Sequence, residues 1–265
     1  MNSIFNAIMI TKVKVGAGPS LDSPFLCLGL GSCFVGHLKT SLSSWNIPYQ
    51  YNPLGTSFNP VSISEQLNWL LDEQYSLEPI ELYKSSVHHL AAGNKFQADS
   101  MELLFAQINN QRQLFNSFLN VSHGNVTLIL SFGTAHAWER NGRIVNNCHK
   151  LPGDFFTRRI LTQQEIIEAW EKVLNKIPKH WNIIFTVSPV RYTKIGLVDN
   201  FLGKSILRSS IEKLLSFRDK CFYFPSYEIV TDELRDYSFS ENNGTHPNEK
   251  AISVVMDRFK DFLSI

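Results

Sequence analysis

Two residues far apart in this chain are of types that cooperate in nucleophilic catalysis. One is a serine that follows a glycine, and the other is a histidine that precedes a proline. Ser32 follows an apolar run and stands between Gly31 and Cys33, where a strand would turn tightly into a helix. Glycine frees the backbone at such a turn, and the next helix begins with unpaired N–H groups that could meet an oxyanion at Ser32. A serine that only caps the helix fits the same position, so the turn alone leaves both interpretations open.

His246 precedes Pro247, at the expected start of the last helix. A histidine there could accept the Ser32 proton if both residues face the same edge of a sheet. The chain holds 8 histidines, so for this position taken alone a surface histidine near a strand end is the favoured interpretation.

Short apolar strands that alternate with amphipathic helices must position these residues. The strands are expected at 25–29, 48–52, 126–131, 183–187 and 221–224, and the helices at 34–44, 61–71, 101–118, 162–177, 204–217 and 247–263. Thr162 and Glu165 form a capping-box pattern at the start of one helix. The alternation predicts an α/β fold with a mostly parallel five-stranded sheet and helices on both faces. We expect one domain over residues 1–265, with long irregular loops at about 72–100 and 134–161.

Ligands of open parallel sheets bind beyond the carboxyl ends of the strands, so the residues that follow each predicted strand are the candidates. They are Gly31–Phe34, Asn52–Gly55, Gly133–His136, Ser188–Arg191 and, after a longer loop, Asn243–Pro247.

Composition narrows the classes of function. The net charge of +1 argues against a surface that tracks nucleic-acid phosphates. No stretch reaches the roughly 20 apolar residues of a membrane span, and the first 15 residues do not have the pattern of a signal peptide. The 4 cysteines form no CxxC pair, which argues against a zinc site. We therefore expect reduced thiols and a cytoplasmic protein.

The ordered set of motifs resembles the GSCFA family. The run Gly31-Ser32-Cys33-Phe34 resembles the motif that names the family. The resemblance covers about residues 26–260 and continues through 52–55, 59–63, 132–135, 147–152, 188–191, 223–228, 234–237 and 246–247. GSCFA proteins look like relatives of the SGNH, or GDSL-like, hydrolases, which have a three-layer flavodoxin-like fold and hydrolyse esters.

The resemblance implies a role for several residues. Ser32 is the expected nucleophile and His246 its base. The expected oxyanion donors are the Ser32 and Gly55 N–H groups, and Gly133 matches the superfamily's third block. The asparagine expected two residues after Gly133 is replaced by Ala135, so Asn147 becomes the candidate side-chain donor.

The acidic residue expected three positions before the base is replaced by Asn243. Three interpretations stay open: another carboxylate such as Glu241 or Asp236 reaches His246, a Ser32–His246 dyad suffices, or catalysis is impaired.

Other family positions have two interpretations each. His149 and Lys150 either grip substrate or hold a loop, and one of His88 and His89 matches a family histidine. Arg191 pairs with a substrate carboxylate, or with Glu228 or Asp236 in a structural ion pair. His136 lines the cleft or is solvated.

The sequence therefore predicts a serine esterase or acyltransferase that acts on a carbohydrate- or lipid-linked acyl ester and requires no metal or cofactor. A binding protein built on an impaired hydrolase site is the alternative. A dinucleotide site is disfavoured because the third glycine of its loop would be Phe34 and no acidic residue ends the second strand. The oligomeric state and the natural substrate stay open.

Overall fold

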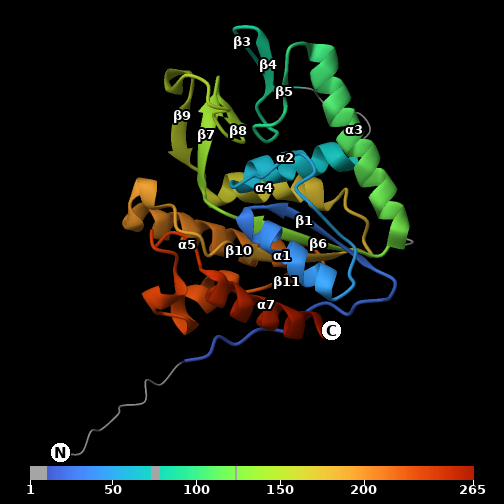
Figure 1. The fold of residues 1–265 in the computed structure, drawn as a ribbon, viewed down its shortest axis with the longest axis vertical. Coiled ribbons are helices and arrows are strands. Elements are labelled where there is room, and N and C mark those ends of the chain that lie inside the picture. The colour runs from blue at the N-terminus through green and yellow to red at the C-terminus, as the bar shows by residue number, and fades with distance from the viewer. Residues whose placement is uncertain (1–10, 73–77, 123) are drawn as a thin grey trace, which may run out of the picture.

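A computed structural model describes residues 11–72, 78–122 and 124–265 (Figure 1). Most of the segment tested above for a signal peptide lies outside the described residues, as do residues 73–77 of the first long loop. No helix in the described ranges combines the length and the apolar character that a membrane crossing requires.

The centre of the described fold is a sheet of five parallel strands. They are β1 (Leu26–Gly31), β2 (Tyr49–Tyr51), β6 (Val126–Phe132), β10 (Asn182–Val187) and β11 (Cys221–Tyr223). Their order is β11-β10-β6-β1-β2, which in chain order is the flavodoxin-like arrangement 2-1-3-4-5. This confirms the predicted α/β class, and it puts the switch point of the topology between β1 and β6.

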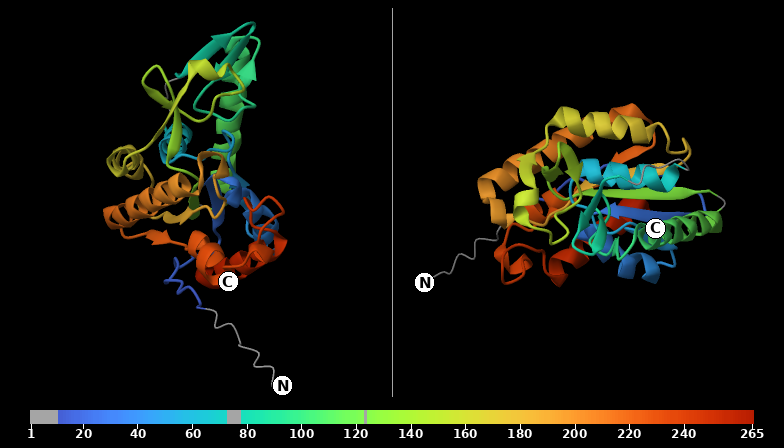
Figure 2. Two further views of the ribbon diagram at one scale, coloured as in Figure 1. Left: turned by 90° about the vertical axis from the view of Figure 1, so that its left-hand side faces the viewer. Right: turned by 90° about the horizontal axis from the view of Figure 1, so that it is seen from above.

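Two layers of helices cover the sheet because successive strand residues point to opposite faces (Figures 1 and 2). Leu28, Leu128 and Ile183 belong to one hydrophobic cluster, whereas Cys27 and Ile129 belong to the other. The first cluster packs under α2 (Pro60–Leu71), α3 (Met101–Leu119), α4 (Gln163–Leu174) and α5 (Leu197–Leu214). The second packs under α1 (Cys33–Ser44), α7 (Glu249–Leu263) and the helical turn 229–233, which follows the one-turn α6 (Ser226–Glu228).

Helix α5 begins at Leu197, seven residues before the predicted start at Lys204. Its first turns expose Val198 and Phe201 while burying Asn200, the reverse of the usual pattern. Apolar periodicity therefore could not detect them.

The two stretches expected to be long irregular loops each contain a small antiparallel sheet, although fewer than half of their described residues are in its strands. One contains β3 (Ile80–Tyr83), β4 (Ser86–His89) and β5 (Gln97–Ala98); the other contains β7 (His136–Arg140), β8 (Arg143–Val145) and β9 (Thr157–Ile160). In Figure 1 both lie beyond α2 and α4. Asn141 and Gly142 join β7 to β8 with positive φ angles, and Asn-Gly is a strong sequence signal for such a hairpin.

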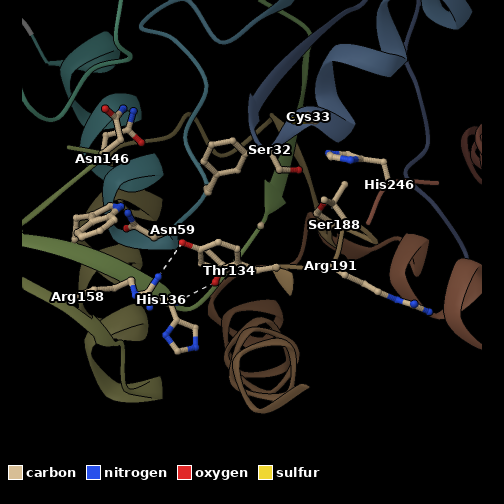
Figure 3. Close-up of a pocket in the computed structure, with 16 residues that line it drawn as sticks. Ser32, Cys33, Asn59, Thr134, His136, Asn146, Arg158, Ser188, Arg191 and His246 are labelled. Atoms are coloured by element: carbon tan, nitrogen blue, oxygen red, sulfur yellow. Dashed lines mark hydrogen bonds between the residues drawn. The ribbon is translucent and has the colours of Figure 1, made fainter. Parts of the chain in front are cut away.

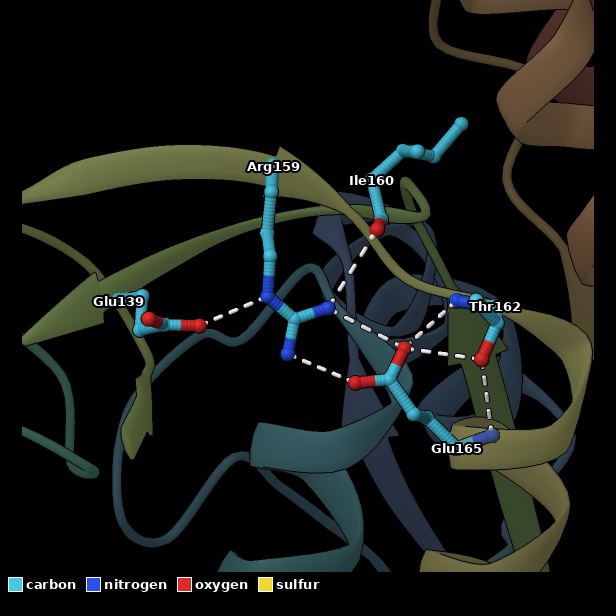
Figure 4. Close-up of polar contacts among 5 residues, drawn as sticks. All are labelled: Glu139, Arg159, Ile160, Thr162 and Glu165. Atoms are coloured by element: carbon cyan, nitrogen blue, oxygen red, sulfur yellow. Dashed lines mark hydrogen bonds and ion pairs between the residues drawn. The ribbon is translucent and has the colours of Figure 1, made fainter. Parts of the chain in front are cut away.

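An arginine fastens the β7–β9 sheet to α4 (Figure 4). The Arg159 guanidinium lies 2.7 Å from Glu139 Oε2 and 2.7 Å from Glu165 Oε1. Glu165 also accepts a hydrogen bond from the Thr162 N–H, which confirms the predicted capping box. Hydrogen bonds from Arg159 lower the pKa of Glu165 to about 2. The sheet is thus tied to the same helix that covers the core.

Candidate active site

A cavity of about 310 Å³ lies where the loops after β1, β6 and β10 meet (Figure 3). Ser32 and His246 both line it, although they are 214 positions apart in the chain. Its lining is Ser32, Cys33, Phe58, Asn59, Gly133, Thr134, His136, Trp138, Asn146, Asn147, Arg158, Ser188, Val190, Arg191, Tyr192 and His246.

The backbone before Ser32 is fixed by Gly31 and Asn52. Gly31 has a φ of +125°, and a Cβ on it would lie 2.1 Å from the Ser131 carbonyl oxygen, so only glycine fits. The Asn52 side chain accepts from the Gly31 N–H at 2.8 Å and donates to the Gly31 carbonyl at 3.1 Å. Glycine and asparagine together hold the turn that presents Ser32.

Ser32 both caps α1 and lines the cavity, so the two interpretations of its position are compatible. Its Oγ accepts from the Phe34 N–H at 3.3 Å and lies 2.7 Å from the Ser131 Oγ, where either hydroxyl can donate. The side chain is 2% exposed. Sequence reasoning missed Ser131; the signal that could have found it is a hydroxyl residue at the carboxyl end of a mostly apolar strand.

His246 is presented by a turn that folds back on itself. The Glu241 N–H donates to the His246 carbonyl at 2.8 Å, and the Arg191 N–H donates to the Thr245 carbonyl at 3.0 Å. In Figure 3 the His246 ring extends toward Ser32, although no hydrogen bond joins these two described residues. The ring Nδ1 lies 3.7 Å from Glu241 Oε2. Of the carboxylates considered for His246, Glu241 is therefore the one beside its ring.

Asn243 does not lie against the His246 ring. Its side-chain oxygen accepts from the Thr245 N–H at 2.8 Å, and the residue is exposed. It shapes the turn that carries the histidine, and Asp236 similarly caps its own local turn by accepting from the Ser238 N–H.

The backbone donors expected for an oxyanion are occupied. The Ser32 N–H donates to Ser131, the Gly55 N–H to Asn52 and the Gly133 N–H to Phe58, at 3.0, 2.8 and 2.8 Å. Gly55 is also absent from the cavity lining. Its φ is +90°, and a Cβ there would lie 2.7 Å from the Gly93 Cα, so this glycine serves the packing of two loops.

Asn147 lines the cavity with a free amide group. Its side-chain oxygen accepts from the His149 N–H at 2.8 Å, whereas its NH₂ group has no acceptor among the described residues. The neighbouring Asn146 differs, because its NH₂ group donates to the Thr56 and Ala92 carbonyls. Of these two asparagines, Asn147 is therefore the one whose NH₂ group can donate a hydrogen bond to a ligand in the cavity.

His88, His89 and His149 are buried and do not belong to the cavity lining. The His89 ring packs 4.3 Å from Trp69, and both its nitrogens lack partners among the described residues. His149 Nε2 lies 3.1 Å from the Ala92 carbonyl oxygen. Burial lowers the pKa of His89 to about 3 and that of His149 to about 4, so both rings are neutral at neutral pH. In this structure they pack the first small sheet, whereas Lys150 is exposed.

The ion pair considered for Arg191 is not formed. The Arg191 guanidinium lies 5.3 Å from the Tyr237 ring centre, while Glu228 accepts from the Tyr223 hydroxyl. Figure 3 shows the Arg191 side chain reaching away from Ser32. His136, in contrast, lines the cavity.

Lys204 is a buried lysine that sequence reasoning missed. Its Nζ donates to the Gly133 carbonyl at 2.7 Å and to the Ser188 carbonyl at 2.6 Å, and burial lowers its pKa to about 7. It joins the loops after β6 and β10. The sequence signal for its burial was the helical spacing of Lys204 from Leu207 and Ile211, which lie on the buried face of α5.

Among the described residues, no group of three or more His, Cys, Asp or Glu side chains is arranged to hold a metal ion. The cysteines at positions 27, 33, 148 and 221 are free.

Comparisons with known proteins identify a family. The model of the GSCFA family matches residues 27–259. Among curated proteins, none matches this chain in sequence.

Three solved structures resemble the fold at low identity. A candidate platelet activating factor from Streptococcus pneumoniae is 9% identical, with a TM-score of 0.45 over 89% of this chain and 83% of that chain. The catalytic domain of peptidoglycan O-acetyltransferase A from the same species is 8% identical, with a TM-score of 0.40 over 95% and 92%. A carbohydrate esterase of family 3 from Talaromyces cellulolyticus is 9% identical, with a TM-score of 0.39 over 91% and 95%.

The burial of His89 and His149 predicts that the folded protein loses stability in acid. Because their folded pKa values lie below the unfolded value, their contribution to stability is complete above about pH 6.5 and is lost as the pH falls toward 4 and 3. Urea unfolding should show the free energy of unfolding decreasing from pH 6.5 to 4. His89→Phe, which keeps a ring against Trp69, should lose less stability over that range. The exposed His180→Gln is the control, and an unchanged pH dependence in His89→Phe would contradict this account.

Proposed function

This chain belongs to the GSCFA family, and on that premise we propose that it is a serine esterase or acyltransferase of the SGNH type, with Ser32 as nucleophile and His246 as base. The observation that carries the proposal is that Ser32 and His246, from distant parts of the chain, line one cavity at the switch point of a parallel sheet. The substrate is an acyl ester on a carbohydrate or lipid, and the proposed location is the cytoplasm.

The proposed reaction uses an acyl-serine intermediate. His246 takes the Ser32 hydroxyl proton while Oγ attacks the ester carbonyl carbon. The tetrahedral intermediate collapses, the leaving alcohol receives that proton from His246, and the acyl group stays on Ser32. Water or an acceptor alcohol then gives a proton to His246 and attacks the acyl carbon, and His246 passes that proton to the departing Ser32 Oγ, which releases an acid or a new ester. Ser131 holds the Ser32 hydroxyl in the resting protein.

The Asn147 amide is the proposed donor to the oxyanion. It lines the cavity, and its NH₂ group has no acceptor among the described residues. The Cys33 N–H, in the first turn of α1, is a second donor because the capping oxygen of Ser32 accepts from Phe34 instead. Two such groups would stabilise the negative charge that develops on the carbonyl oxygen.

Glu241 is the proposed orienting carboxylate. Its position near Nδ1 leaves Nε2 as the nitrogen that takes the serine proton. The pair is partly exposed, with side chains 40% and 53% accessible, so its effect should be far weaker than that of a buried carboxylate.

A binding protein without turnover is the second candidate. The hydrogen bond of Ser32 to Ser131 rather than to His246, together with Ala135 in place of the expected asparagine, favours it. Serine reactivity separates the two candidates.

Ser32 should react with an activated fluorophosphonate. Mass spectrometry of the labelled wild-type protein should locate the adduct on Ser32, and Ser32→Ala should abolish it while the circular dichroism spectrum stays unchanged. Ser131→Ala is the matched control, since it removes the neighbouring hydroxyl and should still be labelled. Equal labelling of wild type and Ser32→Ala would refute the assignment.

Asn147→Asp should isolate the donor role of Asn147. The aspartate keeps an oxygen for the His149 N–H but removes the NH₂ group and adds a negative charge. The expected loss in kcat for 4-nitrophenyl acetate is on the order of 100-fold or more. Asn147→Ala should lose a similar factor, and urea unfolding of both variants controls for damage to the loop. A kcat within about threefold of wild type in both would exclude the role.

Glu241→Gln should lower kcat by about tenfold at neutral pH, because it removes the charge that favours a positively charged His246. Asn243→Asp should leave kcat near that of wild type, since an aspartate oxygen can still accept from the Thr245 N–H. Steady-state kinetics of the two variants decide whether Glu241 or Asn243 orients the His246 ring. A larger change at Asn243 than at Glu241 would restore Asn243 as the orienting residue.

A further inference from the structure

Two adjacent arginines on β9 have opposite surroundings. Successive residues of a strand point to opposite faces, so Arg158 and Arg159 face different environments. Arg159 is held by two glutamates on one face (Figure 4). Arg158 is on the other face and lines the cavity that contains Ser32.

Two aromatic rings hold the Arg158 guanidinium. Its central carbon lies 5.7 Å from the Trp138 ring centre and 5.8 Å from that of Tyr192. Trp138 is its cross-strand partner in β7, and Arg158 Nη1 donates to the Tyr192 hydroxyl at 3.1 Å. These contacts orient the guanidinium, and its remaining N–H groups have no acceptor in the part of the chain that the structure describes.

No carboxylate neutralises Arg158 within the described structure. The other arginines of this small sheet all have glutamate partners: Arg140 with Glu81, Arg143 with Glu65, and Arg159 with Glu139 and Glu165. The described lining of the cavity contains no aspartate or glutamate. A cation that is oriented but unneutralised beside a cavity is suited to bind an anion from outside the chain.

We infer that Arg158 binds an oxyanion, a carboxylate or a phosphate, on the ester that this cavity accepts. This inference rests on the proposed function of Ser32 and names the substrate class: an anionic ester whose charge lies away from the reacting carbonyl. In Figure 3 Arg158 lies across the cavity lining from Ser32 and His246. The guanidinium therefore contacts substrate at one end while the serine reacts at the other.

Kinetic preference for charged esters tests the inference. The anionic probes are 4-acetoxybenzoate and 4-acetoxyphenyl phosphate, and their neutral counterpart is 4-acetoxybenzamide. A fourth probe, mono-4-nitrophenyl succinate, carries its charge on the acyl side and is compared with 4-nitrophenyl butyrate. Wild type should favour at least one anionic probe over its counterpart by about tenfold or more in kcat/KM. Comparison of the first two probes separates carboxylate from phosphate.

The preference should depend on Arg158 and on salt. Arg158→Gln should bring the ratio of anionic to neutral kcat/KM close to one, and Arg158→Lys should keep part of it. Arg159→Gln is the matched control, since it removes the neighbouring cation and should keep the ratio. Higher ionic strength should reduce the ratio in wild type. The inference is overturned if wild type shows no preference, or if Arg158→Gln keeps the preference.

Binding to Ser32→Ala separates failure of this inference from failure of the proposed function. Calorimetry with this variant should give tighter binding of an anionic probe than of its neutral counterpart, and Arg158→Gln in the same background should remove the difference. That result would support the anion site even if no ester is turned over. Equal binding of charged and neutral probes would refute the site even if Ser32 proves reactive.

Discussion

The close approach of β1 and β6 at their carboxyl ends is the constraint on which the site depends. Gly31 is paired with Ser131 across these strands, and a side chain at Gly31 would collide with the Ser131 carbonyl. The approach brings the Ser32 and Ser131 hydroxyls within 2.7 Å of each other. Because the connections from β1 and β6 lead to opposite faces of the sheet, their loops separate at this point and leave room for a ligand.

Buried polar groups keep the surrounding loops in place. Asn52 holds the turn before Ser32, while Lys204 bridges the loops after β6 and β10. Buried donors and acceptors without partners are costly, so each of these contacts restricts the loops to one arrangement. Hydrogen bonding within these loops also affects the chemistry of the site. The backbone N–H groups that the SGNH pattern assigns to an oxyanion already donate to carbonyl groups of the protein. Among the described residues near Ser32, the Asn147 amide and the N-terminus of α1 keep donors without an acceptor.

Of the two small sheets, the one formed by β7, β8 and β9 gives the cavity its distinctive chemistry. The β7–β9 sheet adds Trp138 and Arg158 to a lining whose other residues come mainly from the ends of the central strands. Arg159 and its glutamates fasten this sheet to α4, so one strand supplies an anchor on one face and a free cation on the other. The proposed anion site therefore depends on a rigid element rather than on a loop.

The sequence by itself determined the central fold and the two residues proposed for the chemistry. Continuous apolar runs such as 126–131 allow little but buried parallel strands, because both faces of such strands must be covered, and Gly31 and Pro247 mark the breaks beside Ser32 and His246.

Only the tertiary structure decided the partners of these residues. Ser131 lies 99 positions from Ser32, and Glu241 rather than Asn243 lies beside the His246 ring because a turn folds back. Likewise, β9 falls in a stretch that the sequence analysis expected to be an irregular loop. That Arg158 and Arg159 point to opposite faces of a sheet therefore became known only from the pairing of β9 with β7. Local patterns specify which backbone a segment adopts, whereas contacts between distant segments depend on how those segments pack.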